Sequence, residues 1–215
     1  MSNNGKVYFL ILISLVLIFP ICCGNPTNNS KPEITSFTDD FSDPSSGWPI
    51  SENAEFKYGY KDGKYEIILK KANLIFFALA PIANLSSEYT MQSDMELVNG
   101  TGSYGFVFDY LNSNNFYILQ VNPTFQFYEI WRMIDGWENV TDIIYEPEFI
   151  NQSFNYVRLV KKGNKVKIYL NDNLLSEIEI GSQSEGIRIG IFTATDGSFL
   201  PVVNQYDNFK VSGIF

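Results

Sequence analysis

Apolar and polar residues alternate at period two in several short segments of this chain. The clearest case is residues 165–170, in which Val166, Ile168 and Leu170 alternate with Lys165, Lys167 and Tyr169. Successive side chains of a β-strand point to opposite faces, so this period predicts strands with one face in a core and one in water. The same segments are rich in aromatic and β-branched residues, which also favours strands over helices.

Turn-forming dipeptides separate these segments and predict hairpins. Asp62-Gly63, Asp135-Gly136 and Gly163-Asn164 each stand between two apolar-rich segments, and such residues accept the positive φ angles of tight hairpin turns. The strand pairs expected are 56–60 with 64–69, 127–133 with 137–143, and 156–161 with 165–170, and Asn171-Asp172-Asn173 then leads into 174–180. Strands recur without an amphipathic helix between them, so we expect an all-β, antiparallel two-sheet sandwich.

Segments 73–80 and 103–121 carry apolar residues on both faces. Strands of this kind are expected at the centre of a sheet, covered on both sides, or with one face lining a groove. Polar residues interrupt the apolar strands of this part of the chain at Asp109, Gln120 and Glu129. Burying a polar group without a hydrogen bond costs about 1–3 kcal/mol, so each must face water, a ligand or a partner. If the strands pair in sequence order, the three residues share one groove.

Two tryptophans stand close to Glu129 along the chain. Trp131 follows it by two residues, on the same side of a strand, and Trp137 lies just past the turn at Asp135-Gly136. Indole rings are flat apolar surfaces on which sugar rings stack, so both are candidate ligand platforms. The alternative for each is that it fills the core between the sheets.

The N-terminal residues have the pattern of an export signal. Residues 1–6 are polar with one cation, and residues 7–21 are almost continuously apolar, the order found in secretory signal peptides. As a helix the apolar run spans roughly 22 Å, which is shorter than the hydrocarbon core of a bilayer at about 30 Å. We therefore expect a cleaved signal in residues 1–23, with an uncleaved anchor as the alternative.

The apolar run ends in Cys22 and Cys23, the chain's two cysteines. Adjacent cysteines are poorly placed to cross-link distant segments, so no disulfide framework is expected. The segment from Phe19 to Asn25 resembles a bacterial lipobox, although Ile21 and Cys22 stand where that motif usually has a small residue. The resemblance implies that Cys22 or Cys23 is acylated, in an exported lipoprotein anchored to a membrane of the bacterial envelope. Residues 24–36 follow as a polar tether to a domain over 37–215.

Charge and composition exclude several classes of function. The chain has 15 basic and 24 acidic residues and no histidine. The acidic balance argues against binding nucleic acid or anionic lipid, which needs clustered cations. Because the chain has no histidine, it cannot use a serine or cysteine nucleophile that relies on an imidazole base. Nearly all zinc sites are excluded for the same reason. A bound metal, if there is one, would be a hard cation such as Ca²⁺ held by oxygen atoms.

The order of several segments over residues 37–215 resembles the concanavalin A-like lectin and glucanase superfamily, in particular its laminin G-like and sugar-hydrolase-associated jelly rolls. The segments that carry the resemblance are Asp39–Trp48, Tyr60–Tyr65, Gly105–Asp109, Asn115–Val121, Asn155–Leu159, Gly163–Asn171, Gly190–Phe192 and Tyr206–Val211. The resemblance implies a two-sheet antiparallel jelly roll whose terminal strands lie side by side. It also implies a concave face that binds saccharide in many members, although such a fold does not settle activity.

Paired terminal strands would bring Asp39, Asp40 and Asp207 together. Their oxygen atoms are candidate Ca²⁺ ligands, although such a site needs six to eight ligands, and turn or cap formation is the alternative. Glucanases of the superfamily use a Glu-x-Asp-x-x-Glu strand, and the nearest approach here is Asp94 and Glu96, in reversed order and without the third acid. We expect these two to be solvated strand residues rather than a catalytic pair.

A second acidic pair, Glu146 and Glu148, flanks a proline and is expected in a loop. No catalytic residue is assigned from the sequence. The function expected is that of a lipid-anchored envelope or surface protein whose jelly roll binds carbohydrate or another extracellular ligand. The alternatives are a jelly-roll glycoside hydrolase and a protein-binding adhesin or scaffold.

Overall fold

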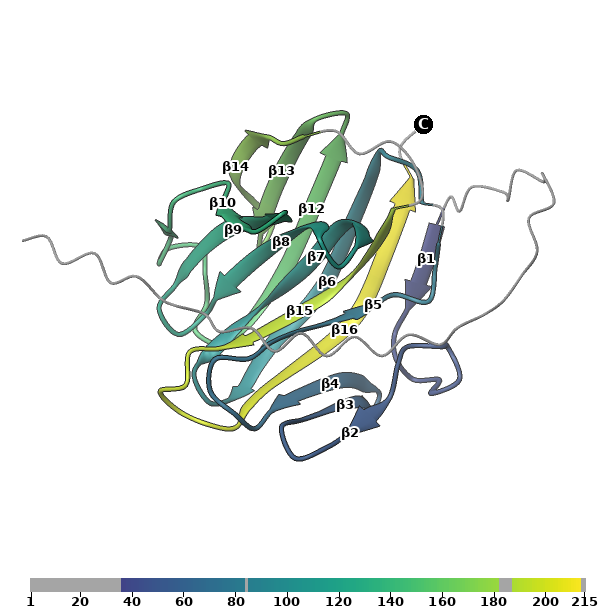
Figure 1. Cartoon of the computed structure of the whole chain (residues 1–215), viewed down its shortest axis with the longest axis vertical. Helices are drawn as coiled ribbons and strands as arrows, with labels where there is room; N and C mark the ends of the chain where they lie inside the picture. Colours follow the sequence, from purple (N-terminus) through teal and green to yellow (C-terminus); the bar gives the residue numbers. More distant parts are fainter. Residues whose placement is uncertain (1–35, 84, 182–186, 214–215) are drawn as a thin grey trace, which may run out of the picture.

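The computed structural model describes residues 36–83, 85–181 and 187–213. These residues form sixteen β-strands and no helix, arranged as two packed antiparallel sheets (Figure 1). The expected all-β, two-sheet sandwich is therefore confirmed. No helix within the described residues is long and apolar enough to span a membrane, and the predicted signal, tether and cysteines in residues 1–35 lie outside them.

One sheet has nine strands. Its order is β14 (Asn173–Glu179), β13 (Lys165–Leu170), β12 (Phe154–Lys162), β6 (Tyr89–Asn99), β16 (Val202–Gly213), β4 (Lys64–Leu69), β3 (Phe56–Lys61) and β2 (Ser51–Glu52), with β1 (Ser36–Asp39) also paired to β16. The pairing of β1 with β16 runs from Ser36 opposite Ser212 to Asp39 opposite Phe209. The first and last described strands thus lie side by side, as the family resemblance implied.

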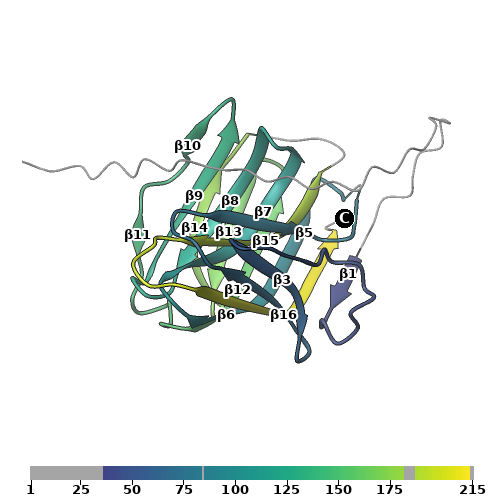
Figure 2. The ribbon, with the colours of Figure 1, turned by 60° about the horizontal axis from the view of Figure 1, so that its bottom comes forward.

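The other sheet has seven strands. Its order is β10 (Trp137–Asn139), β9 (Phe127–Ile134), β8 (Asn115–Asn122), β7 (Gly102–Asn112), β15 (Arg188–Thr195) and β5 (Ile75–Leu79), with β11 (Ile144–Tyr145) also paired to β9. Figure 2 shows β9, β8, β7, β15 and β5 in one layer, with β12, β6 and β16 in the other. Three consecutive hairpin strands, β7, β8 and β9, therefore form the middle and one flank of this sheet.

The predicted hairpin turns have the backbone that their residues favour. Asp62 and Gly63 join β3 to β4 with φ of 52° and 76°, and Gly163 turns β12 into β13 with φ of 59°. Asp135, with φ of 54°, begins the turn between β9 and β10. Local turn chemistry thus fixes three hairpins, although β10 ends at Asn139 and is shorter than the predicted strand over 137–143.

The core between the sheets consists of the inward-facing residues of both, including Tyr65, Met91, Phe106, Leu159 and Ile191, all inaccessible to solvent. Buried hydrogen bonds also join the two layers. Asn204 Nδ2 on β16 donates to the Ser103 carbonyl on β7 at 2.9 Å, and the Tyr206 hydroxyl on β16 donates to the Phe192 carbonyl on β15 at 2.6 Å. These contacts hold β7 and β15 in place against the other layer.

The prediction that segment 73–80 forms a central strand is wrong. Its strand, β5, is at the edge of the seven-stranded sheet and pairs with β15 alone. Both of its faces are apolar because each packs against a different apolar cluster. On the inner face, Phe76 packs on Tyr58 of the opposite sheet, with ring centroids 4.4 Å apart. On the outer face, Phe77 packs on Phe116, with ring centroids 5.4 Å apart. The second such segment does supply an interior strand, β7, paired with β8 and β15.

Candidate ligand-binding site

The outer face of the seven-stranded sheet carries a second apolar cluster, separate from the core between the sheets. It is built on five buried apolar residues and one buried alanine, with larger side chains packed against them. We call this surface the aromatic face, and its members are Ile75, Phe77, Leu79, Val107, Tyr110, Phe116, Ile118, Trp131, Met133, Trp137, Phe192 and Ala194. Six of these residues are buried and the other six are partly exposed, so the accessible part of this face lies at its partly exposed members.

The strand register places the polar candidates on the same surface. Gln120 of β8 lies directly opposite Glu129 of β9, and the next pair along these strands on that face is Ile118 opposite Trp131. Directly opposed side chains of an antiparallel pair have Cβ atoms about 4.5–5.5 Å apart. The sequence therefore predicted the neighbourhood of Gln120, Glu129 and Trp131 correctly, and Trp137, opposite Met133, lies on the same face.

The two tryptophans of the aromatic face contact each other and are partly exposed. Their ring centroids are 6.3 Å apart with an interplanar angle of 86°, and Trp137 meets Phe116 edge to face at 5.7 Å. Phe116 itself is buried. Trp131 and Trp137 thus lie at the accessible edge of the cluster. Their partial exposure is not explained by the alternative that they fill the core between the sheets.

Glu129 has little contact with solvent, at 5% exposed. Burial raises the pKa of its carboxyl group, and the hydrogen bond from the Trp131 side chain offsets part of that rise. Beside it, Gln120 Nε2 donates to Ser103 Oγ at 3.1 Å. One end of the aromatic face therefore combines a carboxyl group, an amide and a hydroxyl group with the edge of an indole ring.

Asp109 does not join this group. Its side chain lies between the two sheets, where Oδ1 accepts a hydrogen bond from the Tyr89 hydroxyl at 2.8 Å and Oδ2 is 3.3 Å from Lys161 Nζ. The pairing of β7 with β8 is irregular between Phe108 and Asn112, and Asp109 has a φ of 49°. This bulge turns the Asp109 side chain inward, so Asp109 does not lie on the face that carries Gln120 and Glu129.

The candidate calcium ligands serve local turns. Asp39 Oδ1 accepts the Phe41 amide at 2.8 Å, and Asp40 Oδ1 accepts both the amide and the hydroxyl of Ser42 at 3.0 and 2.6 Å. Asp207 accepts the amide of Asn208 at 2.7 Å. Within the ranges that the structure describes, no three Asp, Glu, His or Cys side chains are grouped closely enough to hold a metal ion, so Asp39, Asp40 and Asp207 are not brought together as a site.

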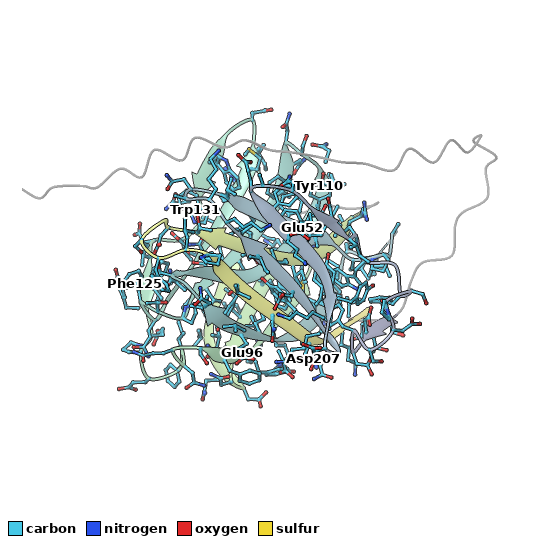
Figure 3. All side chains as sticks on the ribbon, turned by 90° about the horizontal axis from the view of Figure 1, so that it is seen from below. Glu52, Glu96, Tyr110, Phe125, Trp131 and Asp207 are labelled. Carbon is cyan, nitrogen blue, oxygen red and sulfur yellow. The ribbon has the colours of Figure 1, made fainter. Side chains whose placement is uncertain are left out.

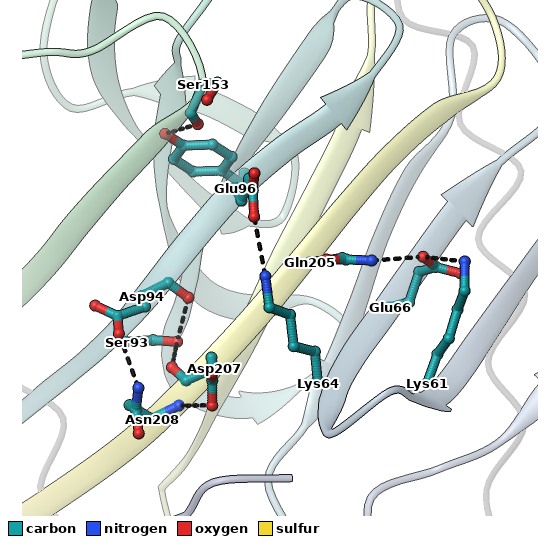
Figure 4. A network of polar contacts seen from close by, with 11 residues as sticks. Lys61, Lys64, Glu66, Ser93, Asp94, Glu96, Ser153, Gln205, Asp207 and Asn208 are labelled. Carbon is teal, nitrogen blue, oxygen red and sulfur yellow. Dashed lines mark hydrogen bonds and ion pairs between the residues drawn. The ribbon is translucent and has the colours of Figure 1, made fainter.

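Asp94 and Glu96 lie on the opposite surface of the molecule, the outer face of the nine-stranded sheet. Figure 3 shows Glu96 and Asp207 on one side of the sandwich and Tyr110 and Trp131 on the other. In the polar network of Figure 4, Lys64 Nζ lies 3.0 Å from Glu96 Oε2, and Asn208 Nδ2 donates to Asp94 Oδ2 at 2.9 Å.

The cavity that Asp94 and Glu96 line is small. Its volume is about 40 Å³, which accommodates water rather than a sugar ring. Burial, and then the charge of Asp94, raise the pKa of the neighbouring Asp207. Glu146 and Glu148 lie between β11 and β12, outside the strands, as expected. Asp94, Glu96 and Asp207 therefore lie on the opposite sheet from Glu129.

Comparison with known proteins places the fold. No protein-family model matches the chain, and no curated protein matches it. Among solved structures, a Bacillus subtilis protein of unknown function with a galectin-like fold has a TM-score of 0.63 and 12% identity, with 85% of this chain and 97% of that chain covered. The Bacillus licheniformis β-glucanase has a TM-score of 0.61 and 11% identity, with 84% and 99% covered.

A carbohydrate-binding module from Bacillus subtilis, CBM66, aligns with a TM-score of 0.53 and 18% identity, over 85% of this chain and 100% of that one. Together with the two packed antiparallel sheets, these similarities define the fold as a concanavalin A-like jelly-roll sandwich. At this level of identity they define the fold alone, because proteins of one fold carry many functions.

Several residues of the aromatic face were not singled out from the sequence. Tyr110 and Phe116 were hidden in the apolar segment 103–121, and Phe77 in segment 73–80. The sequence pattern that could have indicated them is the presence of apolar residues on both faces of neighbouring strands. This pattern indicates a second apolar surface but does not show where that surface ends.

Proposed function

We propose that this protein binds carbohydrate on the aromatic face of its jelly roll. The observation that carries the proposal is the cross-strand contact of Gln120 and Glu129 beside Trp131, on an outer face with exposed indole surface. A sugar ring has an apolar C–H face and a rim of hydroxyl groups. The aromatic face offers the complement, flat apolar rings next to hydrogen-bonding side chains. The similarity of the fold to a carbohydrate-binding module and a β-glucanase supports the same class of ligand.

Each site residue has a distinct role in this proposal. Trp131 and Trp137 present ring surface to the sugar, and the amide of Gln120 both donates to and accepts from hydroxyl groups. The carboxylate of Glu129 accepts hydrogen bonds from hydroxyl groups, and its desolvated position makes each of them stronger than in water. Hydrogen bonds to charged groups are worth about 1.5–3 kcal/mol, so Glu129 is the main polar anchor.

Binding is favoured over hydrolysis by the placement of carboxylates. Glycosidases of the common kind use two carboxyl groups about 5 to 10 Å apart across the scissile bond. The acids on the strands of the seven-stranded sheet are Asp109, Glu129 and Glu138. Asp109 is buried between the sheets and Glu138 pairs with Arg132 at 2.6 Å. Among the acids of the described strands, Glu129 is therefore the one on the aromatic face, which suits a ligand anchor.

A glycan array with the purified full chain tests this proposal. We expect binding to one or a few polysaccharides, and loss of at least about tenfold in affinity in Trp131→Ala and in Glu129→Gln. Tyr169→Ala is the matched control, because Tyr169 is an aromatic side chain on the outer face of the nine-stranded sheet, beside Arg158. Equal affinities for Trp131→Ala and the wild type would remove the aromatic face as the site.

Export and lipid anchoring form the second part of the proposal. Residues 1–23 would act as a signal, Cys22 or Cys23 would carry the lipid, and residues 24–36 would hold the jelly roll away from the membrane of the bacterial envelope. The support is the apolar run and its terminal cysteines. Two or three acyl chains anchor a protein firmly, because each buried CH₂ contributes about 0.8 kcal/mol. Mass spectrometry of the mature N-terminus tests this, and unmodified cysteines in membrane-associated protein would contradict it.

A further inference from the structure

Three buried hydrogen-bond donors without partners lie across the aromatic face. They are the Tyr110 hydroxyl, Trp137 Nε1 and Arg188 Nε, none of which has a hydrogen-bond partner among the residues that the structure describes. A buried polar group left unpaired costs free energy, and native structures rarely keep such groups without a reason. Three on one surface call for a common explanation.

These donors lie in one row across neighbouring strands. Trp137 contacts Phe116 at 5.7 Å between ring centroids, and Phe116 contacts Tyr110 at 5.7 Å. Tyr110 of β7 is in turn opposite Arg188 of β15. Alternation along β15, where Ile189 is in the core, puts Arg188 on the outer face. Figure 3 shows Tyr110 on the same side of the molecule as Trp131.

Arg188 differs from the other two arginines of the chain. Arg132 pairs with Glu138 at 2.6 Å and Arg158 with Asp172 at 3.7 Å. Within the described residues no ion pair joins Arg188 to a carboxylate, and the hydrogen bond that it makes there is a long contact of 3.4 Å from Nη2 to the Ala80 carbonyl. Burial lowers the pKa of its guanidinium group, and the electrostatic influence of Tyr110 offsets part of that fall. Among the residues that the structure describes, no carboxylate pairs with this partly buried cation.

We propose that Arg188 and the neighbouring Tyr110 form a subsite for an anionic group, a carboxylate or a sulfate, on a sugar unit of the ligand, with Trp137 further along the row beyond Phe116. This inference rests on carbohydrate binding at the aromatic face and narrows the ligand to an acidic saccharide. The free atoms of the row present N–H and O–H groups, which match a group that offers only acceptor oxygens. A guanidinium binds such groups through two parallel hydrogen bonds. The anion sits at the Arg188 end, and neighbouring sugar rings extend over the tryptophans toward Gln120 and Glu129.

The test compares three polymers on the purified full chain: polygalacturonate, dextran sulfate and uncharged dextran. The wild type is expected to bind polygalacturonate or dextran sulfate at least about tenfold more tightly than dextran, because the guanidinium makes a charge-assisted contact that uncharged dextran cannot offer. Arg188→Gln is expected to lose this preference and Arg188→Lys to keep part of it. Comparison of the two anionic polymers identifies the anion. Arg158→Gln is the control, since it removes one positive charge from the other sheet.

Each outcome separates the subsite from the broader function. The subsite is overturned if Arg188→Gln keeps the preference for anionic polymers over dextran, or if Arg158→Gln loses that preference equally. In either case, a loss of polysaccharide affinity in Trp131→Ala would leave carbohydrate binding at the aromatic face in place. Anion binding that depends on Arg188 but is unaffected by Trp131→Ala would support the subsite and contradict the tryptophan platform. Absence of binding to all polysaccharides overturns both. The urea midpoint of Arg188→Gln should be no lower than that of the wild type, because the arginine has no carboxylate partner among the described residues. A lower midpoint would indicate a structural role instead.

Discussion

Asp109 and Lys161 form an ion pair between the two sheets, with Nζ and Oδ2 3.3 Å apart and both side chains shielded from solvent. Lys161 Nζ also donates to the Ser87 carbonyl at 2.7 Å, and the Tyr89 hydroxyl donates to Asp109 Oδ1 at 2.8 Å. The bulge that turns Asp109 inward leaves Tyr110, the next residue, on the outer face. The same local irregularity therefore ties the layers together and shapes the aromatic face.

Removing Asp109 should destabilise the fold strongly. Asp109→Ala leaves Lys161 buried without a counter-ion, and breaking a buried pair in this way costs about 3–5 kcal/mol of unfolding free energy. Asp172→Ala breaks the exposed pair with Arg158 and should cost less than about 1 kcal/mol. Urea denaturation of both variants measures the difference. Similar losses in the two variants would contradict a structural role for the interior pair.

Glu129 should make stability depend on pH. Because burial raises its pKa in the folded state, the folded protein favours the protonated form. The stability that this group contributes is complete below the unfolded pKa of about 4.3 and is lost as pH rises through the folded value. Glu129→Gln should therefore be at least as stable as the wild type at pH 7, with an advantage that shrinks toward pH 4.

Denaturation curves between pH 4 and pH 7 measure this dependence. Glu148→Gln is the control, because it removes one carboxylate from an exposed loop. The contrary result is a Glu129→Gln variant that is less stable than the wild type, with a larger deficit at pH 7 than at pH 4. It would show that the carboxylate stabilises the fold.

Trp48 should behave differently from the other two tryptophans. It is 3% exposed and packs on Phe41, Tyr65 and Phe209 at 5.3, 5.4 and 5.0 Å between ring centroids. Trp48→Ala should therefore lower the unfolding free energy by about 3–5 kcal/mol. Trp137→Ala, at the margin of the aromatic face, should cost clearly less. Thermal denaturation compares the two, and a larger loss for Trp137 would mean that it is the core residue.

The parts of the fold that follow local chemistry could be predicted from the sequence. Asp62-Gly63 and Gly163-Asn164 mark their hairpins because few other residues accept those backbone angles. Once β8 and β9 were recognised as neighbours, alternation put Gln120, Glu129 and Trp131 on one face. These predictions needed only period, turn type and sequence order.

Other features depend on tertiary contacts that no local pattern shows. A bulge reverses the direction of Asp109, and bulges carry little sequence signal. β5 is apolar on both faces because a separate apolar cluster packs on each of them. From the sequence pattern alone, such an edge strand cannot be distinguished from a strand at the centre of a sheet. Arg188 alternates with isoleucines as a solvated residue would, and only the three-dimensional structure shows that none of the described carboxylates pairs with it.

The indole N–H signals of the protein in an NMR spectrum test the central claim most directly. The chain has 3 tryptophans, so ¹⁵N-labelled full chain gives three such signals, assignable with Trp131→Phe and Trp137→Phe. On addition of a polysaccharide that the protein binds, the Trp131 and Trp137 signals should shift and that of the buried Trp48 should stay in place. Binding that leaves Trp131 and Trp137 unmoved while residues of the nine-stranded sheet shift would contradict the aromatic face as the carbohydrate site.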